Sequence, residues 1–523
     1  MVLGRALAWT AKRYPERPAV AGARPLTYAE WDARTNGLAR ALGEIGVGRG
    51  DRMALVAANS EPMASAHLAA QKLGAASVPL NVRYDPDELA YCLADAQPKV
   101  LLSDDSTVEL VGQALERLAD GDRTVLIHDG ENPPDGARTL EALTAGGSAG
   151  PLNAGASPDD TSVMLYTAGT TGRPKGVPRS NRAEVSAGLA HIIQARYGPS
   201  ESTLCAMPMY HTMGMRSLVA MVLLGGKLVF LPAFRAGPAL EAIERERLTA
   251  LYLVPTAYWS LLEEPNAADA CRSVGKLAYA GAAMTESLTM RLAGALRPQV
   301  FINHYGSTEI YTFSIEEDAA ARPGSAGRAG VFSRLRVVTA DSTRRVGPDE
   351  LVGIGETGEI VASLQSDEAF GGYWHRPDAD ERALRAGWYF TGDVGEFDER
   401  GDLHVSGRID DMVISGGENV HPLEVEDAMA RCPDVAEVAV VGLPDEKWGH
   451  AVTAFVVIEP GDDNPAERAR QVASWTRAES RLAAYKRPKR IVVIDAVPKS
   501  PVGKVLRREL AAGHYEARAE AEP

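Results

Sequence analysis

Tyr166-Thr-Ala-Gly-Thr-Thr-Gly-Arg-Pro-Lys-Gly176 is the stretch from which the fold and chemistry of this chain can be worked out. The apolar residues 162–165 before it predict a short buried strand that ends at a loop. Glycines let a backbone approach a ligand closely, and threonine hydroxyls with the charge of Lys175 suit a polyphosphate. The spacing is not that of a Walker A loop. A flexible surface loop is the alternative, but this composition favours a phosphate site built from backbone N–H groups or a helix N-terminus.

Composition limits the class of protein. A chain of 523 residues is too long for one ordinary core, so we expect a large, subdivided domain and at least one more. The net charge of −15 argues against general binding to nucleic acid or to anionic membranes. No apolar run is long enough to span a bilayer, and residues 1–13 read as an amphipathic helix, not a signal peptide.

The four cysteines lie far apart in the sequence and form no C-x-x-C pair. This pattern indicates neither a zinc site nor a disulfide framework. We expect reduced, buried thiols in a cytoplasmic protein. The sequence leaves the oligomeric state open, a homodimer included.

Helix and strand signals alternate along the first half of the chain, which predicts parallel α/β layers. A Thr27/Glu30 capping signal opens a helix that extends to residue 45. Residues 129–160 are rich in Gly, Pro, Ala and Asp and are predicted to form a loop. Strands are expected over residues 52–57, 76–80, 99–102, 124–127, 228–231 and 250–254.

A smaller unit is predicted after residue 410. Short strand signals over residues 334–405 give way to helices at 422–431 and 465–481, strands between and after them, and a basic tail. We therefore expect an α/β protein. Its large N-terminal domain of stacked α/β layers with a β-rich subdomain would occupy residues 1–410, and a small, mobile α+β domain residues 411–523.

Two other patterns carry no site. Gly353-Ile-Gly-Glu-Thr-Gly358 matches the dinucleotide-binding spacing, but residues 359–363 after it read as a strand, whereas the motif needs a helix N-terminus. The chain also has no G-x-S-x-G nucleophile elbow on a strand-to-helix turn, and Ser307 lacks the second glycine of that motif.

Four more segments join the phosphate loop. They are Tyr305-Gly-Ser-Thr-Glu309, Trp388-Tyr-Phe-Thr-Gly-Asp393, Gly407-Arg-Ile-Asp-Asp-Met-Val-Ile-Ser-Gly-Gly-Glu-Asn419 and Pro498-Lys-Ser-Pro-Val-Gly-Lys504. In this order the five motifs resemble the adenylate-forming superfamily of acyl-CoA synthetases, carrier-loading adenylation domains and firefly luciferase. The resemblance covers nearly the whole chain, and five motifs in register are very specific.

The resemblance implies an ATP-dependent carboxylate–CoA ligase that forms an acyl adenylate and then a thioester. Glu309, with Thr308 beside it, would reach a Mg²⁺ ion on the phosphates. Negative charge on the phosphates in the transition state calls for Mg²⁺, backbone N–H groups and a lysine. Lys504 would contact the acid and the α-phosphate, His211 would gate the site, and Asp410 would be the hinge. The implied ATP- and AMP-binding residues are Thr167, Gly169, Thr170, Thr171, Gly172, Lys175, Gly281, Tyr305, Asp393 and Arg408.

Within the superfamily the chain looks close to aryl-CoA ligases of the 4-chlorobenzoate and benzoate type. The likeness appears in Pro208-Met-Tyr-His-Thr-Met-Gly214, Ser415-Gly-Gly-Glu-Asn-Val-His-Pro422, Asp445-Glu-Lys-Trp-Gly449 and Tyr485-Lys-Arg-Pro-Lys489. By this resemblance the CoA site comprises Arg83, Gly416, Gly417, Trp448, Tyr485, Arg487 and Lys489. The alternative is that the basic run 486–490 is a solvated face.

The acyl pocket is also implied by this resemblance. Its residues would be Leu189, His211, Thr212, Met213, Tyr252, Gly281, His304, Gly306, Tyr311 and Thr312. Aromatic walls suit a flat ring, so we expect a benzoate-like acid. His304 and Tyr311 replace apolar residues of the chlorobenzoate type, which favours a polar substituent on the ring unless both side chains pair with each other or with backbone.

Three alternatives remain at this stage. The acid could be a medium-chain fatty acid, and the thiol could belong to a carrier protein, although we expect no carrier segment after the basic tail. A catalytically silent nucleotide-binding protein is the third, against which the intact Lys175, Glu309, Asp393 and Lys504 argue.

Overall fold

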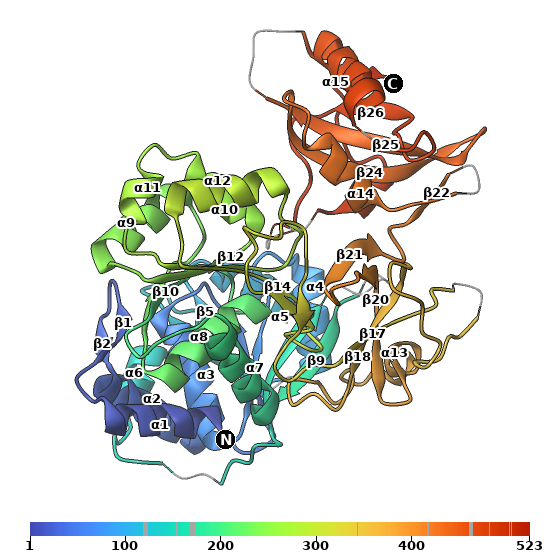
Figure 1. Cartoon of the computed structure of the whole chain (residues 1–523). Helices are drawn as coiled ribbons and strands as arrows, with labels where there is room; N and C mark the ends of the chain where they lie inside the picture. The colour runs from blue at the N-terminus through green and yellow to red at the C-terminus, as the bar shows by residue number, and fades with distance from the viewer. Residues whose placement is uncertain are drawn as a thin grey trace.

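The computed structural model describes residues 1–118, 124–152, 155–167, 173–341, 344–415, 418–459, 464–480, 482–500, 503 and 505–522. Among them the large N-terminal part contains two sheets with helices between them and on their outer faces (Figure 1). The predicted α/β class, with a large N-terminal and a small C-terminal domain, is confirmed.

The first sheet carries the strands around the phosphate loop. In spatial order its strands are β7 (Arg138–Thr139), β6 (Val125–Asp129), β5 (Val100–Asp104), β3 (Arg52–Val56), β4 (Ala76–Pro79), β8 (Thr161–Thr167) and β9 (Lys175–Ser180). β9 pairs antiparallel with β8, while the other pairs are parallel. The phosphate loop is therefore followed in the chain by a strand and not by a helix.

The second sheet lies on the other side of the same core. Its order is β16 (Arg328–Ala329), β15 (Ser314–Glu316), β14 (Val300–Tyr305), β13 (Lys276–Tyr279), β12 (Ala250–Leu253), β10 (Ser202–Cys205), β11 (Lys227–Phe230), β1 (Pro18–Ala21) and β2 (Leu26–Thr27). Strands β1 and β10 to β14 form its parallel part.

Helices fill the space between the sheets and cover them. In chain order they are α1 (Leu3–Arg13), α2 (Tyr28–Glu44), α3 (Glu61–Leu73), α4 (Pro86–Ala96), α5 (Val108–Leu115), α6 (Leu140–Gly146), α7 (Asn181–Gln194), α8 (Thr212–Leu224), α9 (Ala236–Glu246), α10 (Pro255–Leu262), α11 (Ala267–Ala270) and α12 (Glu286–Leu296). Every residue of α3 is buried, and its side chains share one apolar core with α8 and both sheets. On β3, Met53 and Leu55 face this core while Ala54 and Val56 face α4 and α5, so the sheet is covered on both faces.

A third sheet forms the β-rich part before the small domain. It contains β17 (Leu335–Val338), β18 (Gly358–Ser363), β20 (Trp388–Phe397), β19 (Leu384–Arg385) and β21 (Leu403–Arg408), with α13 (Pro377–Ala383) beside it. β18 directly follows the dinucleotide-like glycine pattern of residues 353–358 and confirms the strand predicted over residues 359–363.

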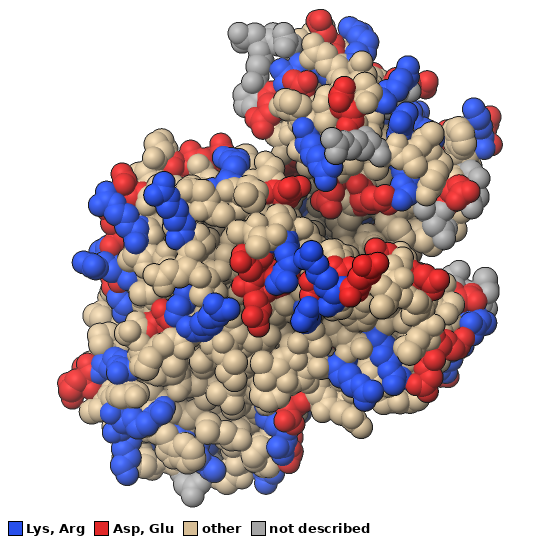
Figure 2. Space-filling view, in the orientation of Figure 1, with Lys and Arg blue, Asp and Glu red and all other residues tan. Residues whose placement is uncertain are grey.

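The small C-terminal domain has its own sheet and cores. The sheet contains β23 (Glu418–Val420), β22 (Val413–Ser415), β25 (Gly449–Ile458), β26 (Arg490–Val493), β27 (Ala519–Ala521) and β24 (Val435–Asp445). The helices are α14 (Pro422–Met429), α15 (Pro465–Glu479) and α16 (Arg507–Ala511), and apolar clusters lie on both faces of the sheet. Figure 1 shows this domain, in orange and red, beside β21, and Figure 2 shows a recess between it and the large part.

Several predictions made from the sequence need correction. Residues 129–160 are not all loop, because they contain β7 and α6, and the basic tail also contains the strand β27. The cysteines are buried and unpaired, as expected. No helix in the described part of the chain combines the length and apolar character that a membrane crossing requires.

Candidate active site

A cross-strand pair brings the predicted ribose-binding residues together. Asp393 of β20 lies opposite Arg408 of β21 in the antiparallel register, and Arg408 Nη1 is 3.1 Å from Asp393 Oδ1. Tyr305, at the end of β14, donates its hydroxyl hydrogen bond to Asp393 Oδ2 at 2.6 Å. The arrangement places a carboxylate, the kind of acceptor that a ribose diol uses, beside a guanidinium and a phenol.

Gly392 is required beside this pair. Its φ is +71°, and a Cβ there would lie 2.9 Å from Arg408 Nη2. Burial, with the adjacent Asp393 carboxylate, holds the pKa of Tyr305 well above its usual value. Tyr305 therefore remains a hydrogen-bond donor, and its half-buried ring is available for a base to stack on.

The phosphate end of the site gathers Lys175, Glu309 and Tyr373. The Tyr373 hydroxyl donates to Glu309 Oε1 at 2.7 Å, and Lys175 Nζ lies 4.4 Å from the centroid of the Tyr373 ring. Burial lowers the pKa of Lys175, and the nearby Glu309 carboxylate opposes that change. Glu309 is itself buried, with one oxygen held by Tyr373. Tyr373 was not predicted from the sequence.

Both ends of the phosphate loop are held in register. Thr167 at the end of β8 pairs with Lys175 at the start of β9. The predicted loop residues Gly169, Thr170, Thr171 and Gly172 lie outside the described residues.

The small domain contacts the large one next to the predicted catalytic lysine. Lys504 itself lies outside the described residues, but Gly503 has a φ of +74°, and a Cβ on it would be 2.5 Å from Thr256 Oγ1 and 3.5 Å from Val254 Cγ2. Val254 Cγ1 is in turn 3.4 Å from a Cβ built on Gly281. The segment that carries Lys504 thus lies beside residues predicted to bind the adenylate.

His211 begins the helix that was predicted to line the acyl pocket. It is the N-cap of α8 and accepts a hydrogen bond from the Met213 backbone at 3.5 Å. Met213 is buried, and its sulfur is 3.9 Å from a Cβ built on Gly281. His211, Thr212, Met213 and Gly281 are therefore neighbours, whereas Leu189 lies 40% exposed on the outer face of α7. The place of Leu189 in the acyl pocket therefore stays a prediction.

The polar residues of the predicted acyl pocket have partners within the protein. Arg216 Nη1 donates to His304 Nδ1 at 3.0 Å, and Arg216 Nη2 donates to Thr312 Oγ1 at 2.8 Å. Tyr311 donates to Glu184 Oε2 at 3.3 Å. This pairing corrects the expectation that His304 and Tyr311 need a polar group on the substrate.

The guanidinium of Arg216 fixes the tautomers of two histidines. Because guanidinium only donates, His304 Nδ1 accepts and His304 Nε2 carries the proton, which it gives to His191 Nδ1 at 3.1 Å. Burial, with the charge of Arg216, holds the pKa of His304 and of His191 well below the usual value. Both rings are neutral and pack near Tyr252.

Sequence reasoning missed the charged members of this cluster. Arg216, Arg179, Glu184, Glu368 and His191 are all buried. One signal could have shown part of it, since Arg216 is the single charged residue of the otherwise apolar helix α8.

The predicted CoA residues fall into two groups. In the small domain, Lys489 Nζ lies 5.0 Å from the Trp448 ring centroid and donates to the Ala484 carbonyl. Arg487 donates to the Leu482 carbonyl, so part of this basic run is anchored and is not a freely solvated face. Tyr485 is 41% exposed.

Arg83 belongs to the second group. It is exposed between β4 and α4 of the large domain. Within the described residues, no hydrogen bond or ion pair connects it to the small-domain group. Gly416 and Gly417 lie outside the described residues.

Comparisons with known proteins agree with this geometry. A family model described as AMP-binding enzyme matches residues 7–374, and one described as AMP-binding enzyme C-terminal domain matches residues 424–504. The long-chain-fatty-acid–CoA ligase FadD13 of Mycobacterium tuberculosis (strain CDC 1551 / Oshkosh) is 33% identical over 93% of this chain and 92% of its own length. The 4-chlorobenzoate–CoA ligase of an Arthrobacter species is 34% identical over 96% and 94%. The crystal structure of ATP-bound MatB from Rhodopseudomonas palustris superimposes with a TM-score of 0.86 at 29% identity, over 98% of this chain and 99% of that one.

The chain belongs to the AMP-binding enzymes, the adenylate-forming superfamily. It is an AMP-forming acid–CoA ligase that uses ATP. The fatty-acid and aryl relatives are almost equally identical to it, so the comparisons do not place it in either subtype.

Proposed function

We propose that this ligase activates a benzoate-like aromatic acid and transfers it to coenzyme A. In the first half-reaction the acid carboxylate attacks the α-phosphorus of ATP and pyrophosphate leaves, which gives an acyl adenylate. In the second, the CoA thiol attacks the acyl carbon and AMP leaves. Neither step needs a covalent nucleophile from the enzyme.

The nucleotide roles follow the geometry of the site. Asp393 and Arg408 would bind the ribose, Tyr305 would stack on the base, and Lys175 with the loop would hold the phosphates. Lys504 would contact the acid and the α-phosphate, where negative charge gathers in the transition state. The approach of Gly503 to Thr256 supports this role, since it brings the Lys504 segment to the large domain.

The donor set beside the phosphates fits a magnesium ion. Mg²⁺ is usually held by one or two carboxylates together with substrate phosphates and water. Glu309, next to Thr308, offers one buried carboxylate near Lys175 and the loop. When bound, the ion neutralises phosphate charge, while the residues of this chain orient the nucleotide.

The charged cluster beyond the pocket carries the proposal of a short, flat acid. Arg216 lies one turn after Met213 in α8, and His304 lies two residues before Gly306 in β14. A medium-length aliphatic chain that passed Met213 would meet these buried charged and imidazole groups, and it would have to break the hydrogen bonds between them to make room. A single ring can stop before them.

Because His304 and Tyr311 are already paired, the proposal does not require a polar ring substituent. A medium-chain fatty acid is the alternative, and a carrier protein is the alternative acceptor of the acyl group. The buried thiols suit a reducing compartment, so we propose a cytoplasmic enzyme.

A substrate panel tests the proposal. Benzoate, 4-hydroxybenzoate and octanoate are compared by kcat/KM for acid-dependent pyrophosphate release, and CoA is compared with phosphopantetheinylated carrier proteins as acceptor. We expect benzoate to exceed octanoate and CoA to be consumed. A preference for octanoate by about tenfold or more, the smallest discrimination that one methylene contact typically supplies, would reject the aromatic assignment.

A further inference from the structure

Arg179 joins three separate backbone segments at the phosphate end of the site. It lies in β9, four residues after Lys175, and its side chain is fully buried. Its Nη1 donates to the carbonyl oxygens of Thr308 at 3.1 Å, Glu309 at 3.2 Å and Glu368 at 3.0 Å. One guanidinium nitrogen therefore holds the turn that carries Glu309.

The ion pair of Arg179 explains how a buried cation is kept there. Arg179 Nε donates to Glu184 Oε1 at 2.5 Å, and the guanidinium carbon lies 3.5 Å from the Tyr311 ring centroid. The other oxygen of Glu184 accepts the Tyr311 hydroxyl. A planar guanidinium can donate to several acceptors and stack on a ring at once, which a lysine ammonium cannot do.

The turn has a second backbone contact with the Glu368 segment. The Phe370 N–H donates to the Glu309 carbonyl at 2.9 Å. From the other side, Tyr373 of the same segment donates to the Glu309 carboxylate. The carbonyl oxygen and one carboxylate oxygen of Glu309 are both held.

Strand β9 links this support to the phosphate loop. Residues four apart in a strand lie on the same face and are separated by about 13 Å. Lys175 at the start of β9 and Arg179 near its end therefore share one rigid element. A shift of the Glu309 turn relative to the loop would break the contacts of Arg179.

We propose that Arg179, charged and paired with Glu184, is a positioning residue that sets the Glu309 carboxylate for the magnesium ion of bound ATP. The proposal rests on the proposed role of Glu309. Groups behind a metal ligand orient it, and their loss typically lowers metal affinity or activity about 10- to 100-fold.

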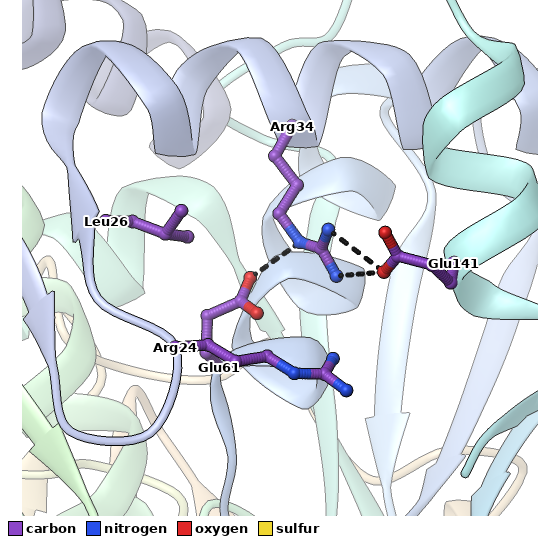
Figure 3. A pocket seen from close by; sticks show the side chains of 5 residues that line it. All are labelled: Arg24, Leu26, Arg34, Glu61 and Glu141. Carbon is purple, nitrogen blue, oxygen red and sulfur yellow. Dashed lines mark hydrogen bonds and ion pairs between the residues drawn. The ribbon is translucent and has the colours of Figure 1, made fainter. Parts of the chain in front are cut away.

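The test compares Arg179→Leu with a matched control, Arg34→Leu. Arg34 is also largely buried and donates to a buried carboxylate, Glu61, at 2.9 Å (Figure 3). That pair lies near β2 and β7, at the opposite edges of the two sheets from β9 and β14. Arg34→Leu therefore reports the effect of losing a buried ion pair away from the site.

Titration calorimetry of ATP with and without Mg²⁺ supplies a readout that does not depend on turnover. For Arg179→Leu we expect ATP binding without Mg²⁺ to stay within about twofold, while the Mg²⁺-dependent gain in affinity falls about tenfold or more. Arg34→Leu should keep the whole gain. Glu184→Gln should also lower the Mg²⁺-dependent gain in ATP affinity, but by less. It replaces Arg179→Leu as the test variant if Arg179→Leu does not fold.

The two half-reactions provide the second readout. Arg179→Leu should slow acid-dependent ATP–pyrophosphate exchange and raise its Mg²⁺ requirement, while thioester formation from synthetic acyl adenylate and CoA stays within about twofold. An equal loss in both half-reactions, or an unchanged Mg²⁺ gain in the folded variants, would overturn the proposal. If the wild type bound Mg·ATP but none of the acids in the panel supported pyrophosphate exchange, the proposed function would fail, while the calorimetry could still support the role of Arg179.

Discussion

Gly503→Ala places a methyl group against the large domain in the orientation described above. The new Cβ would lie 2.5 Å from Thr256 Oγ1, well inside van der Waals contact. Overpacking of this kind costs about 1–3 kcal/mol. If the first half-reaction uses this orientation, as we propose, that cost corresponds to a rate lower by roughly 5- to 150-fold.

The left-handed backbone at residue 503 adds a separate cost. Its φ of +74° is unfavourable for alanine by about 1–2 kcal/mol. That cost does not depend on the contact with Thr256, so it would appear in any orientation that keeps this backbone conformation. The ratio of the two half-reaction rates therefore isolates the clash.

The assay measures ATP–pyrophosphate exchange for the first half-reaction and thioester formation from synthetic acyl adenylate for the second. Thr256→Ala removes the hydroxyl that the methyl group meets, so the double variant should recover most of the exchange rate lost through the clash. Equal loss of both half-reactions in Gly503→Ala, or no recovery in the double variant, would refute the reasoning.

Three further predictions follow from the site and the core. Lys504→Ala should lower pyrophosphate exchange by about 10²-fold, because one preorganised charge is lost from the transition state, and should leave thioester formation from acyl adenylate intact; equal losses would contradict its role. Asp410→Pro fixes φ in the turn between β21 and β22, so single-turnover pyrophosphate release should persist while CoA transfer is lost, and normal steady-state turnover would count against a hinge. Burial lowers the pKa of His67 to about 3, and burial also lowers the pKa of His191 and of His304. The unfolded chain therefore takes up more protons than the folded chain below pH 6.5, and the free energy of unfolding should decrease as the pH is lowered, with a slope that approaches about 1.4 kcal/mol per pH unit for each histidine. In urea titrations at pH 5 to 6.5, His304→Gln should reduce this slope by the contribution of one histidine.

Local signals predicted the long elements well. The Thr27/Glu30 pattern forms a capping box in which both hydrogen bonds are present at the start of α2. In contrast, α6 and α16 are only seven and five residues long, too short for an amphipathic period to stand out. The strand after the phosphate loop was not predicted, because glycine, proline and lysine at its start indicate a turn.

Each motif of the predicted nucleotide site is contiguous in the sequence, so its candidate residues could be named before the fold was known. Asp393, Arg408 and Tyr305 do meet, as the resemblance implied. The buried charged residues around the predicted acyl pocket could not be found in this way, since a charged residue in a helix is normally expected to be exposed. Only the fold shows that Arg216 and Glu184 are buried and that they provide the partners of His304 and Tyr311.

The cross-strand pair of Asp393 with Arg408 also limits where the chain can bend. Ile409 still donates its N–H to the Gly392 carbonyl at 2.8 Å, so the large part remains ordered up to one residue before Asp410. Beyond it, the turn is held by two backbone hydrogen bonds, from Asp411 to Arg408 and from Met412 to Ile409. Exchanging such bonds for water costs about 0.5–1.5 kcal/mol each. We therefore propose this turn of four residues as the place at which the small domain reorients, because few backbone hydrogen bonds hold it and the ribose-binding pair can stay closed beside it.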